Sequence, residues 1–338
     1  MAGVRLKRWD NVRILTEEPK GTPMGRREVS LDKGQLLSWD RGRVFLDIAR
    51  RGCGSACRYC YISAPEAPQE PATPDDVLDA AERLTKDDRY QAGARGTVIS
   101  LSPNSEPFRS AASTLLVMTA LSRLLVNGNP IQIPTKESVP AELLRLVDAE
   151  AKSDDQVVFF ISLATMNRAE SLEPGAAAIE DRLANAARLR RHRCRSCAYI
   201  KPFLKAAIHE LGDFAARLRA ARFDCVCVGM RYRARLRTTA DVVVPVAHVA
   251  DRGGTSPAYE TYSRPHPVHS GYVAERIGPD LRDFYETLRT ACAPTPVFLT
   301  STCVSSFLLD REPPLPVWRE LPQLCVNCRS CGQGVGHR

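Results

Sequence analysis

Short apolar runs alternate with amphipathic segments between residues 44 and 228 of this chain. Each run has the length of a strand, and the segments between the runs carry apolar residues at helical spacing. Strands that alternate with helices form a parallel sheet with helical crossovers, so the pattern predicts an α/β fold. We expect strands at residues 44–49, 96–101, 130–136, 157–163, 198–203 and 223–228. We expect helices near residues 75–86, 111–126, 141–151, 179–191 and 206–221.

Six strands with helices between them predict a partial (β/α)6 barrel at residues 43–230, with its chemistry at the carboxyl ends of the strands. The continuous apolar run at 157–163 is typical of a strand buried on both faces. Thr73, with Asp76 three residues later, predicts a capping box at the first helix. Residues 1–42 are expected to be an extension with little regular structure, and residues 231–338 a cysteine-rich C-terminal region for substrate and an auxiliary cluster.

Composition describes an ordinary globular chain, with 44% hydrophobic and 25% charged residues. The sequence starts without a secretory signal pattern, and its most apolar helix, 111–126, is too short and too polar to span a bilayer. We therefore expect a cytoplasmic protein without a membrane partner. Twelve cysteines in such a chain favour metal binding or catalysis over disulfides. The net charge of +8 indicates an anionic partner, or else only the arginine content of a GC-rich genome.

Three cysteines follow the first predicted strand at the spacing C-x3-C-x2-C: Cys53, Cys57 and Cys60. Thiolates are soft ligands that select iron–sulfur clusters or zinc. A four-iron cluster needs four ligands, so three local cysteines leave one iron for a distant residue or a small molecule. Gly52 and Gly54 let the backbone fold around a bulky group. A zinc site and three buried free thiols are the alternatives.

With the aromatic Tyr59 before the third cysteine, this motif resembles the signature of radical S-adenosylmethionine (SAM) enzymes. The resemblance implies a radical SAM barrel, a four-iron four-sulfur ([4Fe-4S]) cluster whose open iron chelates SAM, and an electron donor such as flavodoxin or ferredoxin. An electron then splits SAM to methionine and a 5′-deoxyadenosyl radical. Across residues 43–230 the chain is similar to the spore photoproduct lyase and DNA repair photolyase-like branch. The segments that carry this similarity are 98–107, 134–136, 161–165 and 173–183.

The resemblance also implies roles for individual residues, and it places Tyr59 against the adenine or the cluster. Asn104 and Glu106 match the position that holds the amino group of SAM, whereas Ser162 and Thr165 resemble contacts to its ribose. Arg182 matches a basic residue that reaches the methionine carboxylate, to which a guanidinium binds bidentately. The alternatives are a loop-capping asparagine, a solvated glutamate and one surface arginine among many.

The tail holds a second cysteine group, Cys325, Cys328 and Cys331, at the spacing C-x2-C-x2-C. This spacing occurs in bacterial ferredoxins and predicts an auxiliary iron–sulfur cluster, with Cys303 as a candidate fourth ligand. Zinc, with His337 as a further ligand, and a thiol-rich tail without metal are the alternatives.

Candidate substrate contacts follow the last predicted strand. Arg231, Arg233 and Arg235 occupy alternate positions, which would share one face of an extended segment and suit phosphates. A solvated edge strand is the alternative. His266 and His269 lie in a stretch rich in Pro and Tyr that is expected to be a substrate loop. No catalytic residue is identified from the sequence.

Spore photoproduct lyases carry a hydrogen-donor cysteine after the second strand, but residues 99–106 contain none. Cys225 and Cys227 could supply a thiol, although two small buried residues of a strand explain them as well. We therefore expect hydrogen abstraction from a small anionic substrate, a nucleoside or sugar nucleotide. Carbon–carbon bond formation in nucleoside-antibiotic biosynthesis of the tunicamycin type is the nearest analogy. The alternatives are a DNA or RNA repair or modifying enzyme and a non-enzymatic iron–sulfur or zinc module.

Overall fold

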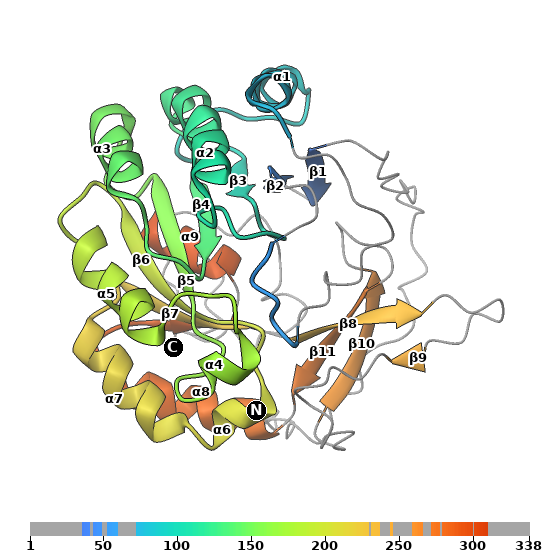
Figure 1. Cartoon of the computed structure of the whole chain (residues 1–338), viewed down its shortest axis with the longest axis vertical. Helices are drawn as coiled ribbons and strands as arrows, with labels where there is room; N and C mark the ends of the chain where they lie inside the picture. The colour runs from blue at the N-terminus through green and yellow to red at the C-terminus, as the bar shows by residue number, and fades with distance from the viewer. Residues whose placement is uncertain are drawn as a thin grey trace, which may run out of the picture.

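A computed structural model describes residues 36–40, 43–48, 53–59, 72–229, 231–236, 244–245, 259–265, 272–277, 279–299 and 301–309. Its main sheet has eight strands in the order β1-β2-β3-β4-β5-β6-β7-β12 (Figure 1). Strands β1 and β2 pair antiparallel, and every further neighbouring pair is parallel. The strands are β1 Leu37–Asp40, β2 Arg43–Leu46, β3 Val98–Leu101, β4 Ile131–Thr135, β5 Val157–Ser162, β6 Arg195–Ile200, β7 Cys225–Val228 and β12 Val297–Phe298.

Helices cover the outer face of this sheet, and α1, α2 and α3 lie side by side over one half of it (Figure 1). The two short helices α4 and α6 lie in the loops after β5 and β6, and a 3-10 helix, Leu125–Asn127, continues α2. The helices are α1 Pro74–Lys86, α2 Ala111–Leu124, α3 Ala141–Glu150, α4 Ala169–Leu172, α5 Ile179–Leu189, α6 Lys205–Ile208, α7 Leu211–Ala221 and α8 Pro279–Ala291.

Strand β5 is buried along its whole length, as its apolar run predicts. Alternate side chains of a strand point to opposite faces. Val157, Phe159 and Ile161 accordingly belong to the large core beneath the outer helices. Val158 and Phe160 belong to a second apolar cluster inside the barrel. The side chains inside the barrel therefore form a second apolar core, separate from the core beneath the outer helices.

That interior is partly filled by a helix from the end of the described chain, α9 Ser301–Leu308. Gln132 of β4 donates hydrogen bonds to the Ser305 hydroxyl at 2.6 Å and to the Ser301 carbonyl at 3.2 Å. Val304 packs in the inner apolar cluster with side chains of β5, β6, β7 and β12. Helix α9 therefore occupies the part of the interior that faces β7 and β12.

Local sequence signals place two helix ends correctly. Thr73 and Asp76 form the predicted capping box at α1, with Asp76 N donating to Thr73 Oγ1 at 3.2 Å and Thr73 N donating to Asp76 Oδ2 at 2.9 Å. Gly128 follows the 3-10 turn in the left-handed conformation (φ 71°), which a glycine adopts without strain. These ends are set by neighbouring residues alone.

Three elements differ from the prediction. The fifth predicted strand starts at Arg195 rather than at 198, and the helix expected at 206–221 is two helices, α6 and α7. Glu210 lies between them as the N-cap residue of α7. Residues 37–40, expected to have little regular structure, form β1, because pairing with β2 completes the edge of the sheet.

A second, antiparallel sheet follows β7, in the order β10-β11-β8-β9. Its strands are β8 Arg231–Leu236, β9 Val244–Pro245, β10 Tyr259–Pro265 and β11 Tyr272–Ile277. The arginine segment is extended, as predicted: β8 pairs with β11 at residues 231–234 and with β9 at Arg235 and Leu236. His266 and His269 lie outside the described residues, as do the side chains of Arg231, Arg233 and Arg235. Over the described part of the chain, no helix is both long enough and apolar enough to cross a membrane.

Candidate active site

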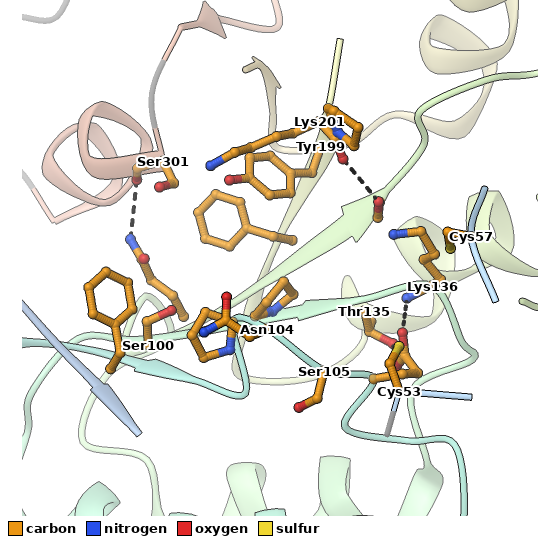
Figure 2. Close-up of a pocket in the computed structure, with 18 of the residues that line it drawn as sticks. Cys53, Cys57, Ser100, Asn104, Ser105, Thr135, Lys136, Tyr199, Lys201 and Ser301 are labelled. Carbon is orange, nitrogen blue, oxygen red and sulfur yellow. Dashed lines mark hydrogen bonds between the residues drawn. The ribbon is translucent and has the colours of Figure 1, made fainter. Parts of the chain in front are cut away.

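A cavity lies at the carboxyl ends of the central strands (Figure 2). Cys53 and Cys57, from the loop after β2, line one side of it, and Lys201 and Ser301 line the other. Phe160 of β5 also lines the cavity. The cavity therefore occupies the position at which partial barrels carry out their chemistry.

The cysteine loop turns sharply twice. Gly54 and Ala56 have φ angles of 63° and 47°, so both residues are left-handed. Cys53 is partly exposed and Cys57 is almost buried, and the Cys53 sulfur lies 3.3 Å from the Ser55 hydroxyl. Cys60 lies outside the described residues. The turns place the two described sulfurs on the cavity wall.

Backbone contacts hold this loop against the segment after β5. Arg58 N donates to Leu172 O at 2.8 Å, and Gly175 N donates to Ser55 O at 3.1 Å. A Cβ atom at Gly175 would lie 2.7 Å from the Gly54 carbonyl oxygen, which is closer than atoms can approach. The approach of the two segments therefore depends on the absence of a side chain at Gly175.

Buried charges lie beneath the loop. The guanidinium of Arg182 donates hydrogen bonds to the Glu173 carboxylate and, at 3.3 Å, to the Ser162 carbonyl. The Tyr59 hydroxyl donates to the other Glu173 oxygen. Burial, and then the charge of Glu173, raise the pKa of Tyr59 well above its ordinary value, so the phenol stays protonated. Lys136 Nζ lies 4.0 Å from the same carboxylate.

Lys136 links these buried charges to the cysteine loop. Burial by itself would lower the pKa of Lys136, but Glu173, Cys57 and Glu106 outweigh it and raise the pKa above its ordinary value. Its ammonium lies 5.8 Å from the centroid of the Tyr59 ring. A cation beside the Cys57 sulfur stabilises negative charge there, and metal ligation requires the thiolate.

The loop after β3 is held from below by Asp47. Asn104 Nδ2 donates to one Asp47 oxygen at 3.1 Å, and the Ser105 hydroxyl donates to the other at 3.3 Å. Burial raises the pKa of Asp47 to about 6, although these two hydrogen bonds oppose the rise. Sequence reasoning missed Asp47, which lies inside the strand predicted at 44–49, whereas β2 ends at Leu46; a single acidic residue in that apolar run was the available signal. Asp47 fixes two side chains of the cavity wall.

Glu106 lies on the same loop and lines the cavity. Its carboxylate accepts hydrogen bonds from the Thr135 hydroxyl, from Lys136 N at 2.7 Å and from Phe108 N at 3.4 Å. Burial raises the pKa of Glu106, while the hydrogen bonds and the Lys136 charge lower it. The carboxylate is therefore fixed in position at the cavity.

The structure brings most of the predicted cofactor residues in the described chain to one place. Those that line the cavity are Cys53, Cys57, Tyr59, Asn104, Glu106 and Ser162. The other two, Thr165 and Arg182, are fully buried and do not line it. The Thr165 hydroxyl instead donates to the Glu210 carboxylate at 2.8 Å. Their contacts with a cofactor stay predictions.

Four further cysteines gather inside the barrel: Cys197, Cys225, Cys227 and Cys303. Cys225 and Cys227 share the inner face of β7, as their spacing predicts, but they pack beneath α9 and do not line the cavity. Burial raises the pKa of Cys227 well above its ordinary value, so this thiol is neutral. Within the described residues no group of three or more His, Cys, Asp or Glu side chains is arranged to hold a metal ion. Cys325, Cys328 and Cys331 lie outside them.

Comparisons with known proteins give the class of fold. No protein-family profile matches the chain, and no curated protein sequence matches it. Among solved structures, a spore photoproduct lyase variant with dinucleoside spore photoproduct superposes with a TM-score of 0.50. The identity is 14%, and the match covers 74% of each chain. This likeness confirms the predicted partial-barrel fold.

Two other solved structures are similar at lower scores. A spore photoproduct lyase variant with bound AdoMet and dinucleoside spore photoproduct has a TM-score of 0.49 at 14% identity, over 72% of this chain and 73% of that one. The radical SAM methyltransferase TsrM from Kitasatospora setae, with tryptophan and a SAM analog bound, has a TM-score of 0.48 at 11% identity. That match covers 77% of this chain and 55% of TsrM.

Proposed function

We propose that this protein is a radical SAM enzyme. The observation that carries the proposal is the position of Cys53 and Cys57, two thiols of the C-x3-C-x2-C motif, on the wall of a cavity at the carboxyl ends of a partial barrel. The donor set is suited to iron, because thiolates are soft ligands and Lys136 places a positive charge beside Cys57. The left-handed conformations of Gly54 and Ala56 shape the loop that carries these thiols.

Cys53, Cys57 and Cys60 would hold a [4Fe-4S] cluster. With SAM bound beside it, such a cluster would supply the electron for reductive cleavage of SAM, the chemistry that serves hydrogen abstraction. Glu106 and Asn104 would bind the ammonium of SAM, since a fixed carboxylate offsets the cost of removing an ammonium from water. Arg182 is proposed to reach the carboxylate of SAM because its Nη2 atom is buried without a hydrogen-bond partner among the described residues, although the side chain does not line the cavity and is paired with Glu173.

The substrate that we propose is a small polar molecule, a nucleoside or a sugar nucleotide. Helix α9 fills part of the barrel interior, which limits the size of the group that can enter. The loop after β3 carries Asn104 and Ser105 in place of a donor thiol, and Cys225 and Cys227 are packed away from the cavity. These features favour biosynthetic hydrogen abstraction, including carbon–carbon bond formation, over repair of a thymine lesion.

The test is SAM cleavage by anaerobically reconstituted, reduced protein, followed as 5′-deoxyadenosine by chromatography. We expect activity in the native protein and none in Cys57→Ala. Cys292→Ala is the matched control, because Cys292 is a buried thiol at the end of α8 that does not line the cavity. Zinc in place of iron in the native protein, or a full cluster without cleavage, would contradict the proposal and support a non-enzymatic metal module.

We further propose an auxiliary iron–sulfur cluster on Cys325, Cys328 and Cys331, with Cys303 as the fourth ligand. Support comes from the ferredoxin-like spacing and from the position of Cys303 on α9, shortly before the tail. Replacing the three tail cysteines with alanine should remove about four iron atoms per chain and leave SAM cleavage intact. An unchanged iron content would contradict the second cluster.

A nucleic-acid modifying enzyme is the second candidate, and the net charge of +8 favours it. Binding to DNA or RNA that weakens steeply with salt would support this candidate. Absence of binding at low salt would leave the small-molecule substrate.

A further inference from the structure

Positively charged side chains line the side of the cavity opposite the cysteine loop. Arg43, at the start of β2, and Lys201, directly after β6, both line it. Arg43 Nη1 lies 3.4 Å from the Ser301 hydroxyl of α9, and its guanidinium carbon lies 4.4 Å from the centroid of the Phe45 ring. The guanidinium is thus positioned by an aromatic face and by the first residue of α9.

Lys201 is positioned by the end of β7. A Cβ atom at Gly229 would lie 2.8 Å from Lys201 Cδ and 2.9 Å from Lys201 Cγ, so the lysine stem rests directly on the Gly229 backbone. Its ammonium lies 5.5 Å from the centroid of the Tyr199 ring. Figure 2 shows the side chain extending across Tyr199 on the side of the cavity where Ser301 lies. The stem is supported from below, and its charged end is directed over the cavity.

The charges around the cavity are unequal. Among its described lining residues, Arg43, Lys136 and Lys201 are cationic, and Glu106 is the single carboxylate. Glu106 accepts a hydrogen bond from Lys136 N at 2.7 Å, and Figure 2 shows Lys136 on the side of Cys53 and Cys57, away from the charged end of Lys201. A cavity with an excess of positive charge and low-dielectric walls attracts anions.

We propose that Lys201 and Arg43, with the hydroxyls of Tyr199 and Ser301, form a subsite for an oxyanion of the substrate. This inference rests on the proposed function, because it assigns the oxyanion to a substrate bound in the same cavity as SAM. The oxyanion is a phosphate or a carboxylate: a guanidinium offers paired donors to either group, and an ammonium adds a point charge. The rest of the substrate then extends toward the cysteine loop.

The test measures anion binding to the full-length protein by titration calorimetry, with pyrophosphate, inorganic phosphate and propionate as probes. We expect at least one probe to bind saturably and not to be displaced by SAM. If the phosphate probes bind more tightly than propionate, the oxyanion of the substrate is a phosphate; if propionate binds more tightly, it is a carboxylate. Lys201→Met and Arg43→Met should each weaken binding about tenfold. Lys152→Met, at an exposed position, should leave the affinity within about twofold.

Gly229→Ala provides a variant that retains every charge. Its methyl group would displace the Lys201 stem, so it should weaken anion binding in the same direction as Lys201→Met. Where a methionine variant does not fold, as judged by circular dichroism, Lys201→Arg and Arg43→Lys take its place. Each should weaken binding by no more than about threefold, against the tenfold loss expected when the charge is removed, because the charge is retained while the geometry changes.

Three results would overturn the subsite. The first is that no probe binds saturably up to about 10 mM. The second is that the native protein and the Lys201 and Arg43 variants bind the probe equally well. The third is that SAM displaces the probe. The last result would assign the cations to the cofactor. These measurements need neither a cluster nor catalysis, so failure of the subsite is distinguishable from failure of the proposed SAM cleavage.

Discussion

Glu173 and Arg182 form an ion pair in which neither side chain exposes any surface. The same carboxylate accepts the Tyr59 hydroxyl, so the pair connects the segment after β5 to the cysteine loop. Two buried charges stabilise a fold only while both are present, because either one alone stays in a medium of low dielectric without compensation. The geometry of the cysteine loop therefore depends on residues that do not touch the cavity.

Glu173→Gln should destabilise the protein by about 3–5 kcal/mol, because it leaves the Arg182 charge buried without its partner. Urea unfolding measures the change. Glu180→Gln is the control: Glu180 pairs with Arg217, but its side chain is 76% exposed, so the loss should stay below about 1 kcal/mol. Equal losses in the two variants would show that burial of the pair is unimportant.

Asp47→Asn should change the pH dependence of stability. The pKa of Asp47 rises from 3.8 to about 6 on folding, so the folded state binds the proton more tightly. Ionised Asp47 therefore lowers stability above about pH 6, and this penalty is relieved as the pH falls toward 4. The free energy of unfolding of the asparagine variant, relative to that of the native protein, should therefore rise by on the order of 2 kcal/mol between pH 4 and pH 7.

Urea unfolding of both proteins across this pH range gives that difference. Because Asn at position 47 cannot ionise, its contribution to the free energy of unfolding does not change with pH. A difference between the two proteins that does not vary with pH would mean that the Asp47 carboxyl is not perturbed by folding.

Gly175→Ala should separate the cysteine loop from the segment after β5, since the new methyl group would meet the Gly54 carbonyl oxygen at 2.7 Å. We expect a loss of about 1–3 kcal/mol and a lower iron content after reconstitution. Gly212→Ala is the matched control, because Gly212 is in α7 and has no atom within 4 Å of the new Cβ. That variant should keep its free energy of unfolding within about 0.5 kcal/mol of the native value, because Gly212 is in the first turn of α7 and its new methyl group meets nothing.

Lys136→Met should weaken cluster binding, because it removes the cation beside Cys57 and leaves Glu173 with one fewer counter-charge. The expected effect is a loss of bound iron on dilution, about tenfold in affinity, measured by chelator competition. Lys152→Met serves again as the exposed control. Iron retention equal to that of the native protein would mean that Lys136 acts on SAM or substrate alone.

The sequence predicted the elements whose signals are local. The apolar run at 157–163 corresponds to β5, and the Thr73 and Asp76 pair caps α1. The cysteine spacing, together with a preceding strand, was sufficient to place Cys53 and Cys57 at the carboxyl end of a parallel sheet.

Features that depend on distant parts of the chain were not predicted. Strand β12 has two residues and is defined by its pairing with β7, not by its own pattern. The apolar run of α9 resembles any core helix, and its place inside the barrel depends on Gln132 and on the inner faces of four strands. Lys201 and Asp47 each follow a strand directly, but their roles emerge only when the loops are brought together.

The place of α9 has a practical consequence for expression. Residues 43–230 include the six consecutive parallel strands, but a fragment that ends there would lack the helix that covers the inner faces of β5, β6 and β7. Apolar surface of this kind, once exposed, promotes aggregation. A truncated protein intended for crystallisation should therefore retain the chain at least through residue 309.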